Sequence, residues 1–270
     1  MKPLRVGKVT IGGKRPVFIL GPCVIESEKF LWRMARKIAE ICAAEDVDLI
    51  FKASYDKANR TSVRSFRGIG ARAGTEILWA IGRELKIPVT TDVHSPAEAE
   101  LAGEKIDLLQ IPAFLCRQTD LLRAAAGTRR PINVKKGQFL APWDVKNIAE
   151  KLSAFGNEQF CFTERGTTFG YNNLVADMRS LYWMREAGYR VLFDATHSVQ
   201  RPGGAGEFTS GDGALAPVLA RAAIAAGCDG IFMEVHEKPT RALSDAANQF
   251  PLKNLPKQLR MLKAIHAAVG

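Results

Sequence analysis

Eight short apolar runs recur along the chain, and segments with a helical spacing of apolar residues separate them. The runs occupy 16–20, 48–54, 87–93, 107–113, 131–136, 159–164, 190–196 and 229–235, and the helical patterns include 30–44, 75–85, 96–102, 143–155 and 215–226. Strict alternation of strand and helix is typical of a parallel sheet, because each helix returns the chain to the edge where the next strand begins. The sequence therefore predicts an α/β fold.

The number of predicted strands favours a closed barrel over an open sheet. A chain of 270 residues has the usual length of a (β/α)8 TIM barrel. A doubly wound open sheet ranks second, because it usually has fewer strands and a Gly-rich turn after its first strand, whereas here GPCVIES follows. We expect a single catalytic domain over 1–270, with a small hairpin at 1–14 capping the N-terminal mouth of the barrel.

The formal net charge of +10 limits the classes of partner. Nucleic acid, an anionic membrane and small anionic substrates all suit a basic protein. The lysines and arginines are dispersed, and several follow apolar runs, unlike the clustered stripe of a nucleic-acid binder. The pattern therefore favours a pocket for phosphates, with neither nucleic acid nor a membrane as partner.

The cysteines and the start of the chain indicate the compartment. The five cysteines are scattered and include no C-x-x-C pair, which argues against a disulfide framework. Residues 1–16 contain no apolar run long enough for a secretory core or a membrane span. We therefore expect a cytoplasmic protein with reduced thiols.

Two segments near the end of the chain are expected at the barrel mouth. The segment 198–213 is too polar and Gly-rich for a regular element, and loops of this length in compact domains are usually functional, so we interpret it as a lid. The segment 236–250 follows the last predicted strand and precedes the final helix, which places it at the rim of the same mouth.

Charged and polar residues gather at the carboxyl ends of the predicted strands, where barrel enzymes carry their reactive groups. These residues are Cys23, Lys52, Ser54, Lys57, Asp92, His94, Gln110, Lys135, Glu164, Arg165, His197 and Glu234. Each has an ordinary interpretation when taken alone, since a free cysteine is often a small buried hydrophobe and a lysine can extend from a strand end to water. Together they predict a polar, highly charged pocket.

Four of the residues near this mouth are metal-ligand types. Cys23, His197, Glu234 and Asp245 offer a thiolate, an imidazole and two carboxylates, a set that suits one divalent first-row ion such as Mn, Fe, Co or Zn. Their spacing is not a local metal-binding motif, so the prediction depends on the fold bringing them together.

A family resemblance covers essentially the whole chain. The stretches GPCVIES, FKASYDKANRTS, TDVHSP, LLQIPAFLCRQTDLL, VKKGQFLAPWD, FTERGTTFGYNNLV, FDATHSVQRPGG and GIFMEVHEKPTRALSDAANQFPL resemble 3-deoxy-D-manno-octulosonate 8-phosphate synthase. Members of that family with cysteine in the first motif resemble the metal-dependent class, whereas asparagine there marks the class that works without metal. Cys23 thus implies the metal-dependent class.

The resemblance implies a transferase that condenses phosphoenolpyruvate with D-arabinose 5-phosphate, releasing inorganic phosphate, on the route to lipopolysaccharide. The residues it implies for binding phosphoenolpyruvate are Lys52, Ser54, Lys57, Lys135 and Arg165, with Gln138 and Gln110 nearby. Those it implies for the pentose phosphate are Asn59, Arg60 and Thr61, where the family more often has serine at the last position. Arg117 resembles the arginine that reaches a neighbouring subunit's site, which implies an oligomer, commonly a homotetramer.

The residues expected to take part in catalysis are Lys57, Asn59, Arg60, Asp92 and His94. Lys57 and Arg60, next to Asn59, are expected to stabilise developing negative charge, and Asp92 with His94 to relay a proton or orient a water molecule.

Three alternatives remain open. The synthase that uses erythrose 4-phosphate at the start of aromatic biosynthesis typically has K-P-R-T-S, and this chain has the extra Asn59 but keeps the Thr-Ser ending at 61–62. A sialic acid synthase would need a further C-terminal domain. A catalytically inactive anion-binding barrel or a nucleic-acid binder would share the basic charge without the chemistry.

Overall fold

The computed structural model describes residues 2–60, 62–205 and 208–269. Within these residues, eight parallel strands form a closed ring, because the last strand pairs with the penultimate strand and with the first. In ring order they are β3 (Val17–Gly21), β4 (Asp48–Lys52), β5 (Val89–Asp92), β6 (Leu108–Ile111), β7 (Ile132–Lys135), β8 (Phe160–Glu164), β11 (Val191–Asp194) and β14 (Gly230–His236). The prediction of a (β/α)8 barrel is confirmed.

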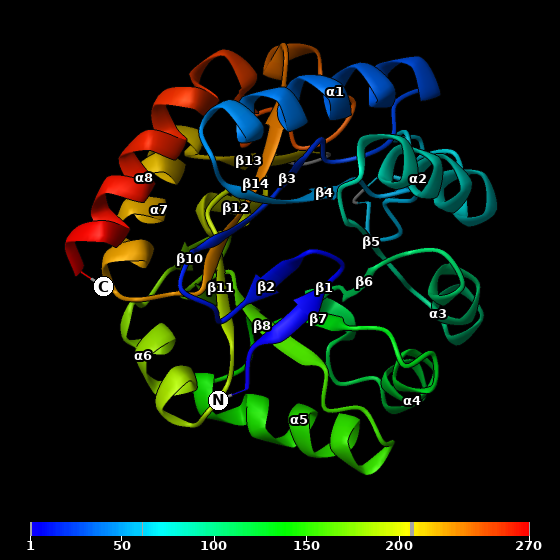
Figure 1. Cartoon of the computed structure of the whole chain (residues 1–270), viewed down its shortest axis with the longest axis vertical. Coiled ribbons are helices and arrows are strands. Elements are labelled where there is room, and N and C mark those ends of the chain that lie inside the picture. Colours follow the sequence, from blue (N-terminus) through cyan, green and yellow to red (C-terminus); the bar gives the residue numbers. More distant parts are fainter. Residues whose placement is uncertain (1, 61, 206–207, 270) are drawn as a thin grey trace.

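Helices surround this ring, one in each crossover between strands and one after the last strand (Figure 1). They are α1 (Glu28–Ala44), α2 (Ala71–Leu85), α3 (Pro96–Gly103), α4 (Thr119–Gly127), α5 (Val145–Ala154), α6 (Arg179–Glu186), α7 (Ala216–Ala225) and α8 (Leu255–Val269). Two of the helices begin at serine N-caps: the side chain of Ser27 accepts from Phe30 N, and that of Ser95 accepts from Glu98 N. These caps explain why α1 begins two residues before the apolar pattern does.

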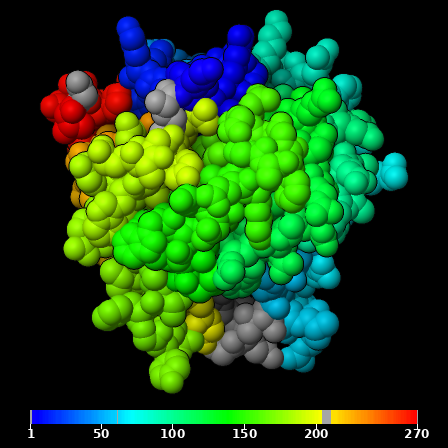
Figure 2. Space-filling model, turned by 90° about the horizontal axis from the view of Figure 1, so that it is seen from below, coloured from blue at the N-terminus to red at the C-terminus, as the bar shows by residue number. Residues whose placement is uncertain are grey.

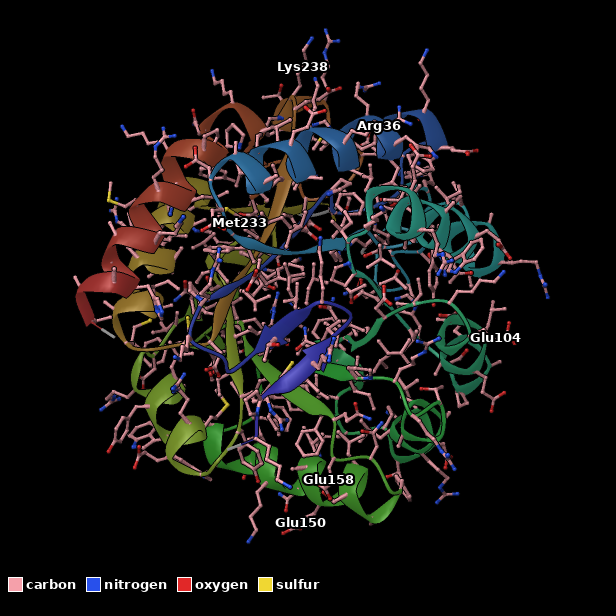
Figure 3. All side chains as sticks on the ribbon, viewed as in Figure 1. Arg36, Glu104, Glu150, Glu158, Met233 and Lys238 are labelled. Carbon is pink, nitrogen blue, oxygen red and sulfur yellow. The ribbon has the colours of Figure 1, made fainter. Side chains whose placement is uncertain are left out.

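The strands are buried on both faces, as expected when helices cover a parallel sheet. In β3, Phe18 and Leu20 pack in the large cluster formed with the helices, whereas Val17 and Ile19 belong to a second cluster inside the barrel. The charged side chains of the helices point away from the ring, as Arg36 does in Figure 3, whereas Met233 of β14 is 1% exposed and packs in the large cluster between the strands and the helices.

An N-terminal hairpin closes one end of the barrel. Its strands β1 (Leu4–Val6) and β2 (Val9–Ile11) are antiparallel, and their buried residues pack with Val17, Ile50 and Phe232 in the inner cluster. The predicted hairpin is therefore present, and its apolar side chains pack against the inner cluster at this end of the barrel.

The segment 198–213 differs from the prediction of an irregular loop. It contains an antiparallel hairpin of β12 (Gln200–Ala205) and β13 (Phe208–Gly211), with an irregular register between Arg201 and Ala205. Backbone hydrogen bonds between the strands do not require apolar side chains, so these two strands could not be predicted from the polar, Gly-rich sequence. Three smaller strands lie outside the ring: β9 (Thr167–Thr168) pairs with β10 (Leu174–Val175), and β15 (Phe250–Pro251) pairs in parallel with the end of β14.

None of the helices in the described residues has both the length and the apolar character needed to cross a lipid bilayer. All five cysteines are free and buried.

Candidate active site

A cavity of about 960 Å³ opens at the carboxyl ends of the barrel strands. It lies opposite the N-terminal hairpin: Figure 2 shows the dark-blue N-terminal residues at one end, and the light-blue and yellow-green segments near residues 60 and 170 projecting at the other. The predicted residues that line it are Lys52, Lys57, Asn59, Arg60, Asp92, His94, Gln110, Lys135, Gln138, Arg165, His197 and Asp245. The predicted polar pocket is therefore present as a cavity.

Three predicted metal ligands meet at one side of this cavity. One ligand atom each of Cys23, Glu234 and Asp245 lies within 4.8 Å of the other two. Cys23 Sγ is 3.1 Å from Asp245 Oδ2. Gly21, two residues before Cys23, allows the ends of β3 and β4 to lie close together, since a Cβ there would lie 1.8 Å from the backbone oxygen of Lys52.

His197 lies at the edge of this group rather than within it. Its Nε2 is 3.6 Å from Glu234 Oε1, and its Nδ1 is 2.8 Å from Asp194 Oδ2. Asp194 is fully buried and also accepts a hydrogen bond from the backbone N–H of His197. A histidine that ligates a metal usually gives its other ring nitrogen to such a carboxylate, so the donor set and its support suit a divalent cation.

The charges around the carboxylates are balanced by two lysines. Lys52 Nζ is 3.0 Å from Glu234 Oε1 and 3.2 Å from the backbone oxygen of Cys23, and Lys57 Nζ is 3.6 Å from the same Glu234 oxygen. Burial raises the pKa of Glu234, but Lys52 and Lys57 outweigh it and lower that pKa to about 2. Burial and the nearby Glu234 raise the pKa of the Cys23 thiol well above its ordinary value. A bound cation would replace that thiol proton.

Lys135 is a further buried lysine that lines the cavity. Its ammonium group pairs with Asp194 and lies 3.2 Å from the centroid of the Phe232 ring. Burial lowers the pKa of Lys135 to about 8, even though Asp194 favours its charged form. It is therefore a buried cation held in place before any anion binds.

Arg165 and Gln138 carry polar atoms that are buried without a hydrogen-bond partner. These atoms are Arg165 Nη1 and Gln138 Oε1. Arg165 uses its other terminal nitrogen, Nη2, to donate to Gln200 Oε1 at 2.7 Å. A buried donor without a partner costs stability, so Arg165 Nη1 indicates a place where an anionic ligand would be favoured.

A buried ion pair behind the cavity holds the backbone that carries Arg165. Glu164 Oε1 accepts from the N–H groups of Arg165 and Gly166 at 2.9 and 2.7 Å. Glu164 Oε2 is 3.6 Å from Lys136 Nζ, which also donates to the backbone oxygen of Leu140 at 2.9 Å. Lys136 is completely buried, so this network fixes the turns on both sides of the arginine.

Asp92 is surrounded by donors. Gln110 Nε2 donates to its Oδ1 at 2.5 Å, Ser54 Oγ donates to its Oδ2, and Lys52 Nζ lies 3.5 Å away. Although burial raises the pKa of Asp92, Lys52 and Lys57 hold it below its ordinary value. This carboxylate is well placed to orient groups and poorly suited to accept a proton.

His94 is held by a residue that the sequence interpretation missed. Its Nδ1 is 2.9 Å from Glu98 Oε2, and Tyr55 Oη donates to the same oxygen at 2.7 Å. The ring of Tyr55 meets that of His94 edge-on at a centroid distance of 5.9 Å. The described contacts thus connect the His94 ring to Glu98 rather than to Asp92, so the two proposed proton-relay residues have separate supports.

The residues implied for binding the pentose phosphate have fewer described contacts than those implied for phosphoenolpyruvate. Arg60 Nη2 donates to the backbone oxygen of Leu243 at 2.6 Å, which joins the loop after β4 to the rim of the cavity. Asn59 lines the cavity but is exposed, and Thr61 lies outside the described residues. Arg117 is exposed and is not among the residues lining its own cavity.

The structure adds Glu98, Asp194 and Gln200 to the predicted set. Asp194 is a charged residue near the end of the predicted strand 190–196, and Ser95-x-x-Glu98 has the spacing of a helix N-terminus, so both left a signal in the sequence. Gln200 has no such signal, because its contacts depend on the hairpin that the sequence concealed.

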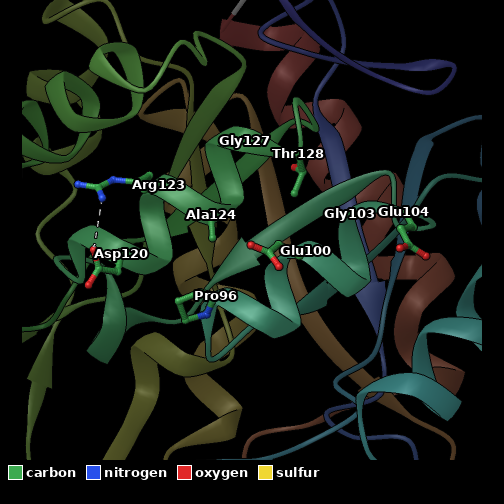
Figure 4. Close-up of a pocket in the computed structure, with 9 residues that line it drawn as sticks. All are labelled: Pro96, Glu100, Gly103, Glu104, Asp120, Arg123, Ala124, Gly127 and Thr128. Atoms are coloured by element: carbon green, nitrogen blue, oxygen red, sulfur yellow. Dashed lines mark ion pairs between the residues drawn. The ribbon is translucent and has the colours of Figure 1, made fainter.

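A second hollow, of about 710 Å³, lies between α3 and α4 on the outside of the barrel (Figure 4). Its lining includes Glu100, Glu104 and Asp120, and its one arginine, Arg123, pairs with Asp120 at 3.9 Å. A groove with this charge balance does not suit phosphates.

Comparisons with known proteins agree over the full length. A family model described as the DAHP synthetase I family matches residues 2–269. Proteins named 2-dehydro-3-deoxyphosphooctonate aldolase are 58% identical in Pelobacter propionicus, covering 98% of this chain and 97% of the relative, and 56% identical in Geobacter sp. strain M21, covering 100% and 99%. The protein of that name from Geobacter sulfurreducens is 54% identical and covers 99% of both chains.

Proposed function

This chain belongs to the DAHP synthetase I family, and we propose that it condenses phosphoenolpyruvate with D-arabinose 5-phosphate to give 3-deoxy-D-manno-octulosonate 8-phosphate and inorganic phosphate. The resemblance stated from the sequence motifs is confirmed by full-length relatives that carry the name of this enzyme. The reaction serves lipopolysaccharide biosynthesis.

The observation that carries the proposal is the concentration of buried cations in one cavity. Lys52, Lys135 and Arg165 are 1%, 5% and 6% exposed, and each reaches the cavity from the end of a different strand. Buried cations are costly unless they are paired, and Arg165 still has an unpaired nitrogen. A small substrate with both a carboxylate and a phosphate, such as phosphoenolpyruvate, would complete this pairing.

In this proposal, phosphoenolpyruvate is bound by polar and charged side chains from several strand ends. They are Lys52, Ser54, Lys57, Lys135, Gln138 and Arg165. Gln110 holds Asp92 in place through a hydrogen bond. The pentose phosphate extends toward the rim, where Asn59 and Arg60 receive it. Thr61 is proposed for the same role from the sequence motif alone. Arg60 would then exchange its bond to a backbone oxygen for a phosphate oxygen.

One divalent ion, such as Mn, Fe, Co or Zn, would be held by Cys23, His197, Glu234 and Asp245. When bound, such an ion polarises an oxygen atom or lowers the pKa of a bound water molecule. The remaining work falls to the chain: Lys57 and Arg60 stabilise negative charge, Asp92 orients its neighbours, and His94, held by Glu98, is the candidate for proton movement.

The chemical balance of the reaction is simple. The methylene carbon of phosphoenolpyruvate bonds to the aldehyde carbon, and the aldehyde oxygen takes up a proton to become a hydroxyl. A water molecule loses a proton as its oxygen bonds to the carbon that bears phosphate. The bond between that carbon and the bridging oxygen then breaks, phosphate leaves with the bridging oxygen and the bonding electrons, and the added hydroxyl loses its proton to form the ketone. The β12 and β13 hairpin lines the cavity through Gln200 and Ser210 and would help to exclude bulk water.

We further propose that residues 1–270 act as one catalytic domain within a cytoplasmic homotetramer. Arg117 is exposed and outside its own cavity, as a residue that serves a neighbouring subunit would be. The exposed aromatic residue Phe114 lies close by in sequence, lines the cavity rim and is 54% exposed. Its burial against another subunit would remove apolar surface from water.

The test is the identity of the product. The protein is incubated with arabinose 5-phosphate and phosphoenolpyruvate labelled with ¹⁸O at the bridging oxygen, and the products are analysed by mass spectrometry. The proposal predicts an eight-carbon phosphorylated acid and inorganic phosphate that retains the label. Release of unlabelled phosphate, or of pyruvate without a condensed product, would contradict it.

A further inference from the structure

We infer that Gln200 is a positioning residue that couples the phosphate-binding arginine to the metal-binding carboxylate, so that phosphoenolpyruvate and the cation each strengthen the binding of the other. The inference depends on the proposed assignment of Arg165 to phosphoenolpyruvate and of Asp245 to the metal.

The side chain of Gln200 bridges the two residues directly. Its Oε1 accepts from Arg165 Nη2 at 2.7 Å, and its Nε2 donates to Asp245 Oδ1 at 3.2 Å. Gln200 is 9% exposed, so water competes little for these bonds. The orientation of the amide is determined by chemistry, because only the oxygen can face a guanidinium and only the nitrogen can face a carboxylate.

The bridge uses one terminal nitrogen of Arg165 and one carboxylate oxygen of Asp245. On Arg165, Nη2 is occupied by Gln200, while the buried Nη1 has no partner. On Asp245, Oδ1 is occupied by Gln200, while Oδ2 lies 3.1 Å from Cys23 Sγ on the side of the candidate metal site. Gln200 therefore selects which nitrogen meets the phosphate and which oxygen meets the cation.

Asp245 lies in a turn. Its φ of 49° is in the left-handed region, which aspartate adopts more readily than most residues other than glycine. Its backbone oxygen accepts from Asn248 N at 2.9 Å, and its Oδ2 also accepts from Ser244 Oγ at 3.1 Å. The carboxylate of Asp245 is thus held by hydrogen bonds from both Gln200 and Ser244.

The position of Gln200 is set by the base of the hairpin. Gln200 pairs with Gly211 across β12 and β13. An added Cβ at Gly211 would lie 2.0 Å from Asn248 Oδ1, so the hairpin base packs against the same turn that carries Asp245. A ligand that orders Arg165 or Asp245 therefore also orders Gln200. When the second ligand binds, the conformational entropy of these side chains has already been lost, so its binding costs less free energy.

The experiment measures binding rather than turnover, with the full chain freed of metal. The dissociation constant of Mn²⁺ is measured with and without saturating phosphoenolpyruvate, and that of phosphoenolpyruvate with and without Mn²⁺. The wild type is expected to give the same coupling factor in both directions, in the usual range of about 5- to 150-fold. In Gln200→Met, which keeps the volume and loses both hydrogen bonds, the factor is expected to fall to about one, with Mn²⁺ affinity alone about 10- to 100-fold weaker.

Two further variants complete the test. Gln200→Glu keeps an acceptor for Arg165 but places a like charge against Asp245, so it is expected to lose the coupling. It provides the test if Gln200→Met folds poorly. Arg201→Met removes the exposed ion pair with Asp212 in the same hairpin and is expected to keep the wild-type factor.

Persistence of the coupling in a folded Gln200 variant, or its absence in a wild type that binds both ligands, would overturn the inference. A wild type that binds neither Mn²⁺ nor phosphoenolpyruvate would instead contradict the proposed site itself.

Discussion

Asp194 joins the two halves of the candidate site, since its Oδ2 lies 2.8 Å from His197 Nδ1 and also pairs with the ammonium of Lys135. One carboxylate thus orients a proposed metal ligand and a proposed phosphate-binding lysine. It is fully buried and also accepts from the hydroxyl of Thr196 at 3.1 Å, so it has little freedom to turn away from either.

Replacing Asp194 with asparagine should weaken the binding of both Mn²⁺ and phosphoenolpyruvate. We expect Mn²⁺ affinity to fall about 10- to 100-fold, because the imidazole loses the partner that fixes its tautomer and orientation. Isothermal titration of the metal-free variant measures this loss. Unchanged Mn²⁺ affinity would remove His197 from the ligand set, since a histidine outside the metal site would not transmit the change.

The pKa of Lys135 predicts how phosphoenolpyruvate binding depends on pH. Burial lowers this pKa to about 8 in the free protein, so the lysine loses its charge as the pH rises through that value. An anion binds best to the charged form, and affinity in metal-free protein should therefore decline above pH 8. Lys135→Arg stays charged throughout, so its affinity should lack this decline. The same inflection in the arginine variant would assign the titration to another group.

The buried pair of Lys136 and Glu164 should contribute mainly to stability. Lys136→Met leaves Glu164 buried without a cation, and we expect a loss of about 3–5 kcal/mol in the free energy of unfolding. Denaturant titration measures the loss. The double variant Lys136→Met with Glu164→Gln should recover part of it, because the uncompensated charge is gone, while the KM for phosphoenolpyruvate stays raised through the loosened backbone at Arg165. Equal stability of the single and double variants would contradict this account of the pair.

Cys23 provides the test of the metal class. Chelation should abolish turnover of the wild type, and Mn, Co, Fe or Zn should restore it to different degrees. Cys23→Asn moves the chain toward the metal-independent pattern, and we expect it to retain part of the turnover in the presence of chelator. Full wild-type activity in protein shown by elemental analysis to be metal-free would refute the ligand assignment.

The sequence predicted the barrel because its evidence is local. The short apolar runs of the strands and the helical spacing of the segments between them depend on residues near one another in the chain. The strand-end rule then placed Cys23 and Glu234 at one mouth, where the structure brings them together.

The supporting contacts could not be predicted in this way. Glu98, Asp194 and Gln200 act through partners on other elements, and their distances depend on how a helix turn, a strand end and a hairpin pack. The hairpin of β12 and β13 was missed because backbone pairing, rather than an apolar pattern, holds it together. Arg117 stays a prediction, since its proposed partner lies in another subunit.

The most direct measurement is phosphate release from phosphoenolpyruvate with arabinose 5-phosphate or erythrose 4-phosphate as acceptor, each with and without chelator. We predict turnover with the pentose phosphate alone, and its loss when chelator is added. Turnover with the tetrose phosphate alone would contradict the assignment and move this chain to the first step of aromatic biosynthesis, whereas no release with either acceptor after metal is supplied would contradict a catalytic role altogether.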